Sequence, residues 1–371
     1  MIFFLLIFLL LYGGLNFHFF FALKYTLHLS DQTQCIVILL LVFLILAPII
    51  IRFLEKVHLD TLARHVAYCG YLWMAFIFLF FFIQISFDIT RLVLNVFSEN
   101  LVNPQTRTIL FGLAVFLSFS CVVYGYVDAQ NLSVNKLEIY SDKLDPTMDK
   151  IRIVQLSDVH IGLMIRGKRL ERILQSVKNE KPDILVSTGD LLDGELDNIM
   201  REAEQFTTIK PKYGKYAVTG NHEYYAGIEK ALDFTRKAGF EVLRDESKKV
   251  AGINIVGLED PTARQMGYAG KSISALHLFP QVTSNEFILL LKHQPTIKKD
   301  ANFDLQLSGH THGGQIFPFM FFTRIFFPEN CGYYALTEHK SFYISRGAGT
   351  WGPPVRFLAS PEITVIDLIK K

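Results

Sequence analysis

Cysteine is scarce in this chain. Four cysteines occur among 371 residues, at positions 35, 69, 121 and 331. No two of them have the spacing of a zinc finger, and they indicate no disulfide framework. We interpret them as isolated buried thiols, so they leave the redox compartment of the protein open.

A large excess of charge is also missing. The 37 lysines and arginines nearly balance 35 acidic residues, which gives a net charge of +2, and the basic residues form no long run. Proteins that bind nucleic acid usually concentrate positive charge on one face or in one arm. The sequence therefore predicts no nucleic-acid partner.

Charged side chains are absent from four long apolar runs in the first 130 residues. The runs are 2–23, 35–51, 67–86 and 108–127, and each comes close to the length of about 20 residues that spans a bilayer. Pumps and transporters usually place ionisable groups inside their spans. We therefore predict that residues 1–130 form an all-α transmembrane bundle of four helices that acts as an anchor, and we disfavour transport.

Four spans place both ends of a multi-pass membrane protein on one side of the bilayer. The lysines and arginines of the connecting loops are evenly divided between the two sides, so the loops alone do not orient the protein. Basic residues after the last run, at positions 136, 143, 150 and 152, favour a cytoplasmic location for the second half of the chain.

The second half of the chain has an ordinary soluble composition. Residues 131–149 read as a polar linker with a first strand at 136–140, and strands then alternate with segments of helical periodicity through 150–371. The predicted helices are 167–179, 198–209, 227–238 and 272–278. We also expect a strand over 248–257 and a hairpin of 333–337 with 341–345. This alternation predicts stacked sheets flanked by helices.

The run from Ser308 to Gln315 places His310 and His312 inside a glycine-rich turn. Glycine lets the backbone turn sharply and approach a ligand closely, and neutral imidazole is a common ligand of divalent metals. Taken alone, the turn fits a metal site and an ordinary turn with two surface histidines equally well.

Four earlier strands also end in side chains that can bind a metal. The residues that follow them are Asp158 and His160, Asp190, Asn221 and His222, and His293. Ligands of α/β sheets bind at the carboxyl ends of the strands. Five strand ends of this kind therefore predict one shared crevice.

In chain order these residues resemble the D-x-H, G-D, G-N-H-[DE], H and G-H-x-H blocks of the calcineurin-like metallophosphoesterases. No block lacks a ligand, and the resemblance covers residues 148–371. Segments 313–315, 345–349, 353–356 and 361–363 further resemble a bacterial, membrane-associated subgroup. The resemblance implies a metallophosphoesterase domain at 150–371, folded as a four-layer α/β/β/α sandwich, in a bacterial inner membrane protein.

The resemblance also implies a role for each residue. One ion would be held by Asp158, His160, Asp190 and His312, and the other by Asp190, Asn221, His293 and His310, with Asp190 bridging both. His222 would act as a catalytic residue that stabilises the transition state or protonates the leaving oxygen. Nitrogen and oxygen ligands without thiolate suit two divalent ions of Mn, Fe, Zn or Co, and a bridging hydroxide would attack phosphorus.

These features predict a membrane-anchored, dinuclear metal-dependent phosphoesterase, for which we expect a lipid-linked phosphoester as substrate. One alternative is a pyrophosphate hydrolase that acts on a nucleotide-linked acylated sugar in lipid A biosynthesis. An alternative from another class is a catalytically inactive membrane scaffold or sensor, although inactive relatives usually lose ligands. The oligomeric state stays open.

Three further features allow more than one interpretation. Asp260 precedes a proline and is interpreted as a structural turn residue. Arg346 is suited either to a substrate phosphate or to a nearby carboxylate. Residues 316–328 are rich in phenylalanine and too short to span a bilayer. They form either a loop packed in the domain core or an apolar lip beside the metals that contacts the membrane surface.

Overall fold

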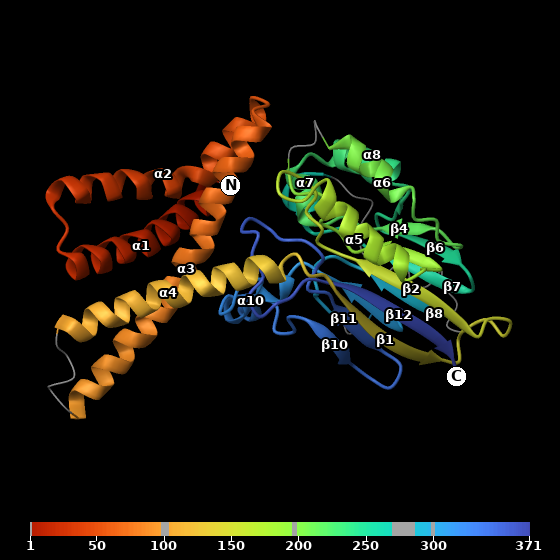
Figure 1. Ribbon diagram of the computed structural model, residues 1–371. Coiled ribbons are helices and arrows are strands. Elements are labelled where there is room, and N and C mark those ends of the chain that lie inside the picture. Colours follow the sequence, from red (N-terminus) through yellow and green to blue (C-terminus); the bar gives the residue numbers. More distant parts are fainter. Residues whose placement is uncertain (1, 98–103, 195–198, 269–285, 298–300) are drawn as a thin grey trace. The chain divides into compact units, whose positions relative to one another are not determined.

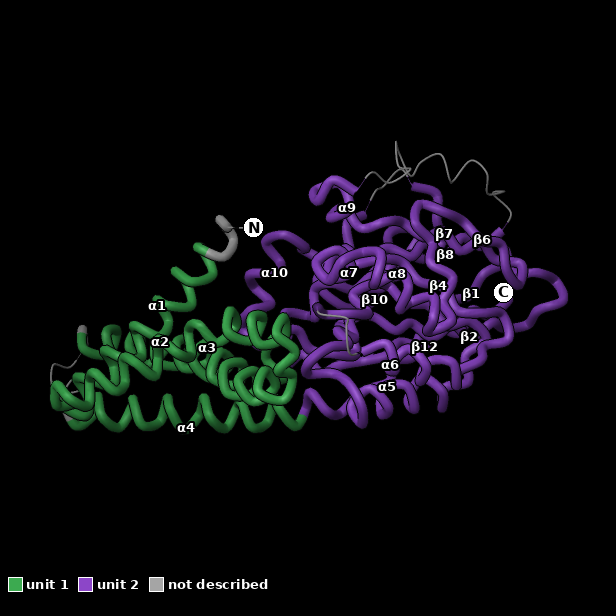
Figure 2. The backbone as a smooth tube through the Cα atoms, turned by 90° about the horizontal axis from the view of Figure 1, so that it is seen from above, with its two compact units in different colours: residues 1–127, 352–357 green, residues 128–351, 358–371 purple. Residues whose placement is uncertain are grey.

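The computed structural model describes residues 2–97, 104–194, 199–268, 286–297 and 301–371 (Figure 1). The chain divides into two compact units, coloured separately in Figure 2. Unit 1 comprises residues 1–127 and 352–357, and unit 2 comprises residues 128–351 and 358–371.

Unit 1 consists mainly of four long helices. They are α1 (Ile2–Leu27), α2 (Asp31–Lys56), α3 (Asp60–Phe97) and α4 (Pro104–Asp128). All four are long and apolar enough to cross a membrane, which confirms the predicted number of N-terminal helices. Helix α3 extends beyond its apolar run at both ends, so Asp60 and Asp88 lie inside the helix and not between helices. Both charged residues lie outside the apolar run of α3, toward the ends of the helix. Asp88 also pairs with Arg91, one turn away on the same helix, at 3.5 Å.

Small and polar side chains join the helices of unit 1. A Cβ added at Gly70 of α3 would lie 2.5 Å from the Cβ of Ala47 in α2, so the missing side chain permits close packing of the two helices. The indole of Trp73 donates a hydrogen bond to Asn16 Oδ1 at 2.8 Å. The prediction of buried thiols is wrong for Cys35 and Cys69, which are exposed on these helices.

Unit 2 contains two mixed six-stranded sheets. The first sheet has the order β1-β12-β2-β3-β4-β5, and the second has the order β10-β11-β9-β8-β7-β6. The strands of the first sheet are β1 (Ser133–Ser141), β2 (Lys150–Leu156), β3 (Ile184–Ser187), β4 (Lys215–Ala217), β5 (Glu241–Val242) and β12 (Glu362–Lys370). The strands of the second are β6 (Glu246–Val250), β7 (Ile253–Gly257), β8 (Phe287–Leu291), β9 (Leu305–Ser308), β10 (Gly332–Ala335) and β11 (Ser341–Ile344).

Helices complete the layers of unit 2. They are α5 (Lys168–Asn179), α6 (Met200–Phe206), α7 (Asn221–Tyr225), α8 (Ile228–Lys237), α9 (Thr262–Gln265), the short 3-10 turn η3 (His312–Gly314) and α10 (Met320–Phe326). Two sheets combined with these helices form the predicted α/β/β/α sandwich (Figure 1).

Alternation of side chains along the strands explains the layering. In β2, Ile151 and Ile153 face the second sheet and join the core between the sheets. Val154 and Leu156 join a second core with the apolar stripe of α5, α6 and α8. Because successive strand residues point to opposite faces, one strand contributes to both cores.

Some predicted elements differ from the structure. The strand expected over 248–257 is the hairpin of β6 and β7, because Ala251 and Gly252, with φ of 50° and 74°, turn the chain between them. The first strand expected at 136–140 within the linker is confirmed as β1, which is longer than expected and pairs with β12 in parallel. The hairpin of β10 and β11 is confirmed. The helix expected at 272–278 lies outside the described residues.

Candidate metal centre

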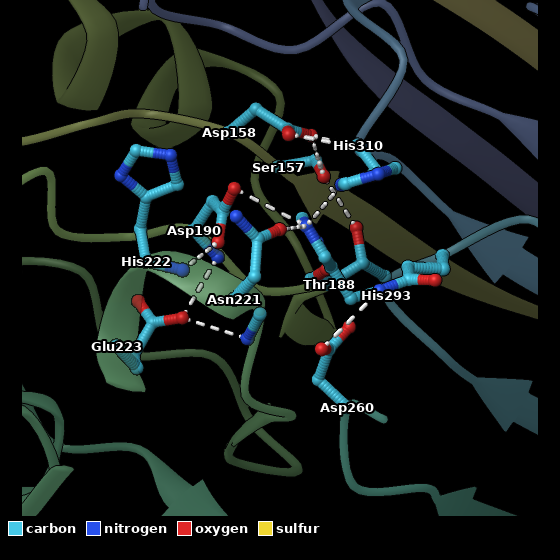
Figure 3. A network of polar contacts seen from close by, with 12 residues as sticks. Ser157, Asp158, Thr188, Asp190, Asn221, His222, Glu223, Asp260, His293 and His310 are labelled. Atoms are coloured by element: carbon cyan, nitrogen blue, oxygen red, sulfur yellow. Dashed lines mark hydrogen bonds and ion pairs between the residues drawn. The ribbon is translucent and has the colours of Figure 1, made fainter. Parts of the chain in front are cut away.

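The candidate ligands follow the carboxyl ends of five strands. Strands β2, β3 and β4 of the first sheet lead into the segments that carry Asp158, His160, Asp190 and Asn221, and β8 and β9 of the second sheet lead into those that carry His293, His310 and His312. Figure 3 shows five of these side chains together with His222; the five are Asp158, Asp190, Asn221, His293 and His310. The side chains that follow the five strand ends therefore converge, as the sequence analysis expects.

One group of converging side chains comprises Asp158, His160 and His312, all of them buried. The Nε2 atoms of the two imidazoles lie 3.0 Å apart, and His312 Nε2 lies 3.4 Å from Asp158 Oδ1. Nitrogen and oxygen atoms that converge this closely form a ligand set suited to a borderline divalent metal.

A second group comprises Asp190, His293 and His310. His293 Nε2 lies 3.2 Å from Asp190 Oδ2 and 3.1 Å from His310 Nδ1. The amide oxygen of Asn221 also lies 3.2 Å from His293 Nε2. On the opposite side of its ring, His293 Nδ1 lies 2.8 Å from the carbonyl oxygen of Thr188. A proton on Nδ1 that donates to this carbonyl leaves Nε2 free to bind a metal.

Asp190 connects the two groups. Its Oδ2 atom is 3.2 Å from His293 of the second group and 3.8 Å from His160 of the first. Its Oδ1 atom accepts a hydrogen bond from the backbone N–H of His222 at 2.9 Å. This position agrees with the bridging role that the resemblance implies, since a carboxylate between two cations reduces their repulsion.

The backbone at the site is unusual. Asp158, His160, Asp190, His310 and His312 have φ between 50° and 74°, a left-handed conformation that is uncommon for residues with a side chain. Such conformations persist where the surrounding structure imposes them and cluster at functional sites. Five of the seven candidate ligands are therefore aimed by strained turns.

Glycines and a buried carboxylate hold these turns. A Cβ at Gly309 would clash with Ser157 and Asp158, and one at Gly220 would clash with Asp190. The carboxylate of Glu223 accepts hydrogen bonds from the backbone N–H groups of Asp190, Leu191, Leu192 and Gly220 at 2.7–3.2 Å. Glu223 therefore fixes the loop that carries Asp190, and it lies outside the groups of converging ligand atoms.

Asp193 is a residue of the site that the sequence prediction missed. Its Oδ1 atom lies 3.2 Å from His222 Nδ1, and its backbone oxygen lies 3.1 Å from the same nitrogen. With His160 and His222 it forms a third group of converging ligand atoms. The available signal was a second carboxylate three residues after Asp190, in the same loop.

The buried charges shift the pKa values of the site. Burial raises the pKa of Asp190, but His293, His222 and His160 outweigh it and hold this pKa well below its usual range. Burial lowers the pKa of His222, yet Asp190 and Asp193 overcome this effect and raise it to about 9. Burial, together with the charge of His293, lowers the pKa of His310 to about 4, which favours the neutral imidazole that binds metals.

Two residues with open interpretations take structural partners. Arg346 donates from Nε to Glu362 Oε2 at 2.8 Å, so it pairs with a carboxylate. Asp260 accepts a hydrogen bond from the backbone N–H of Thr262 at 2.9 Å, at the start of α9, as expected of a turn residue. Neither residue belongs to the groups of converging ligand atoms.

Comparisons with known proteins give the same family. Residues 151–314 match the family described as Calcineurin-like phosphoesterase. An uncharacterized metallophosphoesterase of Aquifex aeolicus is 38% identical over 259 residues, which cover 68% of this chain and 98% of that protein. An uncharacterized metallophosphoesterase of Campylobacter jejuni is 32% identical, with 78% of each chain covered.

A vertebrate relative also matches. A protein of Danio rerio described as a transmembrane protein with metallophosphoesterase domain is 35% identical over 69% of this chain and 62% of its own length. Relatives of this kind are thus found in bacteria and in animals. The matches agree with the buried histidine and aspartate groups at the strand ends, and the chain belongs to the calcineurin-like metallophosphoesterase family.

Proposed function

We propose that this protein is a membrane-anchored phosphoesterase that uses two divalent ions. The observation that carries the proposal is the pair of ligand groups, Asp158 with His160 and His312, and Asp190 with His293 and His310, which Asp190 connects. Two ions bound there would neutralise phosphoryl oxygens and supply an acidified water. Residues 1–130 would serve as the anchor, 131–149 as the linker and 150–371 as the catalytic domain.

The residues of the chain itself would position and protonate the substrate. His222 Nδ1 is held by Asp193, so a proton on Nε2 is the one available for transfer to a leaving oxygen. Asp190 and Asp193 raise the pKa of His222 to about 9, which favours the protonated form of the imidazole. A protonated group beside the ligand groups suits general acid catalysis.

The substrate that we propose is a phosphoester linked to a lipid. Four helices of membrane-crossing length and composition would keep the site near lipid. This location would favour encounters with a lipid-linked substrate and would not favour encounters with a soluble one. We also propose Mn, Fe, Zn or Co as the metals, because the ligands are imidazole, carboxylate and amide groups without thiolate. The proposed location is a bacterial inner membrane with the domain on the cytoplasmic side.

The experiment is a substrate screen with the full-length protein purified in detergent. Lipid phosphoesters, nucleotide-linked pyrophosphates and a soluble chromogenic phosphodiester would be compared after removal of metals, with and without added Mn²⁺. We expect metal-dependent hydrolysis that is fastest with a lipid phosphoester. Preference for the nucleotide-linked acylated sugar would support the pyrophosphate hydrolase instead. If the metal-bound protein hydrolysed none of these substrates, the result would support the inactive scaffold or sensor.

A further inference from the structure

Helix α10 exposes an apolar surface next to the candidate metal centre. None of its seven residues is buried, and the exposed fraction reaches 56% for Phe321, 72% for Ile325 and 79% for Phe326. Helix α5 has the usual arrangement for a surface helix, with an apolar stripe turned into the core. The interpretation of residues 316–328 as a loop packed in the core is therefore wrong for α10.

The exposed helix is fixed in place by its polar and backbone contacts. A Cβ at Gly314 would clash with the backbone of Met320, where α10 begins. Thr323 donates to Asn330 Oδ1 at 3.0 Å, and Thr311 donates to the backbone oxygen of Asn330 at 2.5 Å. These contacts attach α10 to the turn that carries His310 and His312.

Further aromatic side chains lie between α10 and the candidate metal centre. The ring of Phe327 lies 5.1 Å from the ring of His310. Trp351, half exposed, exchanges two hydrogen bonds of 2.9 Å with the side chain of Gln315, and its ring lies 5.7 Å from that of His222. Aromatic rings therefore lie beside His310 and His222.

The chemistry of this surface fits a lipid layer. An apolar patch of this kind usually marks a binding surface. The only charged residue of α10 is Arg324, which is exposed, and residues 312–328 contain no acidic side chain. Phenylalanine and tryptophan beside arginine are typical of helices that lie in the interfacial region of a membrane. The same chain carries four helices able to cross a membrane.

We propose that α10 and its flanking aromatic residues dock into the surface of the bilayer. Phe321, Phe322, Ile325 and Phe326 would enter the acyl-chain region, and Arg324 would meet anionic headgroups. A helix of seven residues extends about 10 Å, which suits shallow insertion and not a span. This docking would place the mouth of the metal centre at the membrane surface, and it does not depend on the reaction that the site performs.

The test measures lipid contact directly in the full-length protein. Ile325→Trp adds a fluorophore to the apolar surface, and Lys178→Trp adds one to the exposed polar face of α5 as a matched control. Both variants would be reconstituted in phosphatidylcholine vesicles whose acyl chains are brominated or not, with the unaltered protein giving the contribution of Trp73 and Trp351.

We expect brominated lipid to quench the added emission of Ile325→Trp at least several-fold more than that of Lys178→Trp. Adding Phe321→Ser and Phe322→Ser to Ile325→Trp should weaken this quenching. Equal, weak quenching at both positions would overturn the proposal. Emission of Ile325→Trp that is shifted to the blue but insensitive to brominated lipid would also overturn it, because a protein partner or a second copy would then cover the surface.

Discussion

The carboxylate of Asp193 lies 3.2 Å from Nδ1 of His222. The two residues come from different strand-end loops, one after β3 and the other at the start of α7. The contact orients the imidazole and leaves its Nε2 atom as the available proton donor. It also helps to raise the pKa of His222 to about 9, so the role proposed for His222 depends on a residue outside the recognised motif.

Replacing Asp193 should therefore change the pH dependence of the reaction. A general acid is active while protonated, so the rate falls as the pH rises through its pKa. Asp193→Asn removes one of the charges that raise the pKa of His222, and the alkaline limb of the kcat profile should move to lower pH. We expect kcat to fall by less than the range of about 10²–10⁴-fold that is usual for loss of the acid itself, with both metals retained. The control is Asp233→Asn, on the exposed face of α8. If the alkaline limb of the kcat profile of Asp193→Asn did not move, the role proposed for Asp193 beside His222 would be contradicted.

His222 itself should matter for turnover and not for metal binding. It contacts Asp193 and stands outside both groups of proposed ligands. We expect His222→Ala to lower kcat by about 10²–10⁴-fold, the usual range for a group that transfers a proton. Elemental analysis of the purified variant checks the metal content. Loss of a metal from His222→Ala would show that the histidine is a ligand.

Asp190 should contribute more to metal binding than Asn221. The carboxylate of Asp190 approaches histidines of both groups, whereas Asn221 approaches His293 of one group only. Asp190→Asn should therefore weaken both metals, and Asn221→Ala should weaken one. Metal titrations followed by calorimetry compare the two variants with the unaltered protein. The dinuclear arrangement would be contradicted if both variants bound the same number of metal ions per protein. Full activity of the unaltered protein after exhaustive chelation would also contradict it.

Glu223 should stabilise the domain before any metal binds. Its buried carboxylate accepts four backbone hydrogen bonds from the turns around Asp190 and Gly220. Glu223→Gln turns an N–H₂ group toward these donors, and we expect the free energy of unfolding to fall by about 1–3 kcal/mol. Thermal unfolding of the metal-free protein measures the change. Glu229→Gln on α8 is the matched control, and equal stability of the two variants would count against this role.

The four helices of unit 1 should place both chain termini on one face of the membrane. Reporters fused before Met1 and after Lys371 should therefore give the same reading, and we expect the cytoplasmic one. A reporter inserted after Leu29, between α1 and α2, should give the opposite reading. Opposite readings at the two termini would mean that one of the helices does not cross.

The sequence by itself determined the four apolar helices, the alternation of strands and helices, and the positions of the candidate ligands. These features are local, because they depend on hydrophobic periodicity and on which residue follows each strand. The break between β6 and β7 was missed because positive φ at Ala251 is set by the turn and not by the residue type.

Only the tertiary structure decided which groups meet across the strand ends. The pairing of Asp193 with His222 joins residues 29 positions apart, and the carboxylate that pairs with Arg346 belongs to Glu362. The exposure of α10 was equally undecided, because an apolar segment of this length fits a core as well as a surface. Side-chain contacts between distant segments depend on how the two sheets stack, and no local pattern in the chain encodes that arrangement.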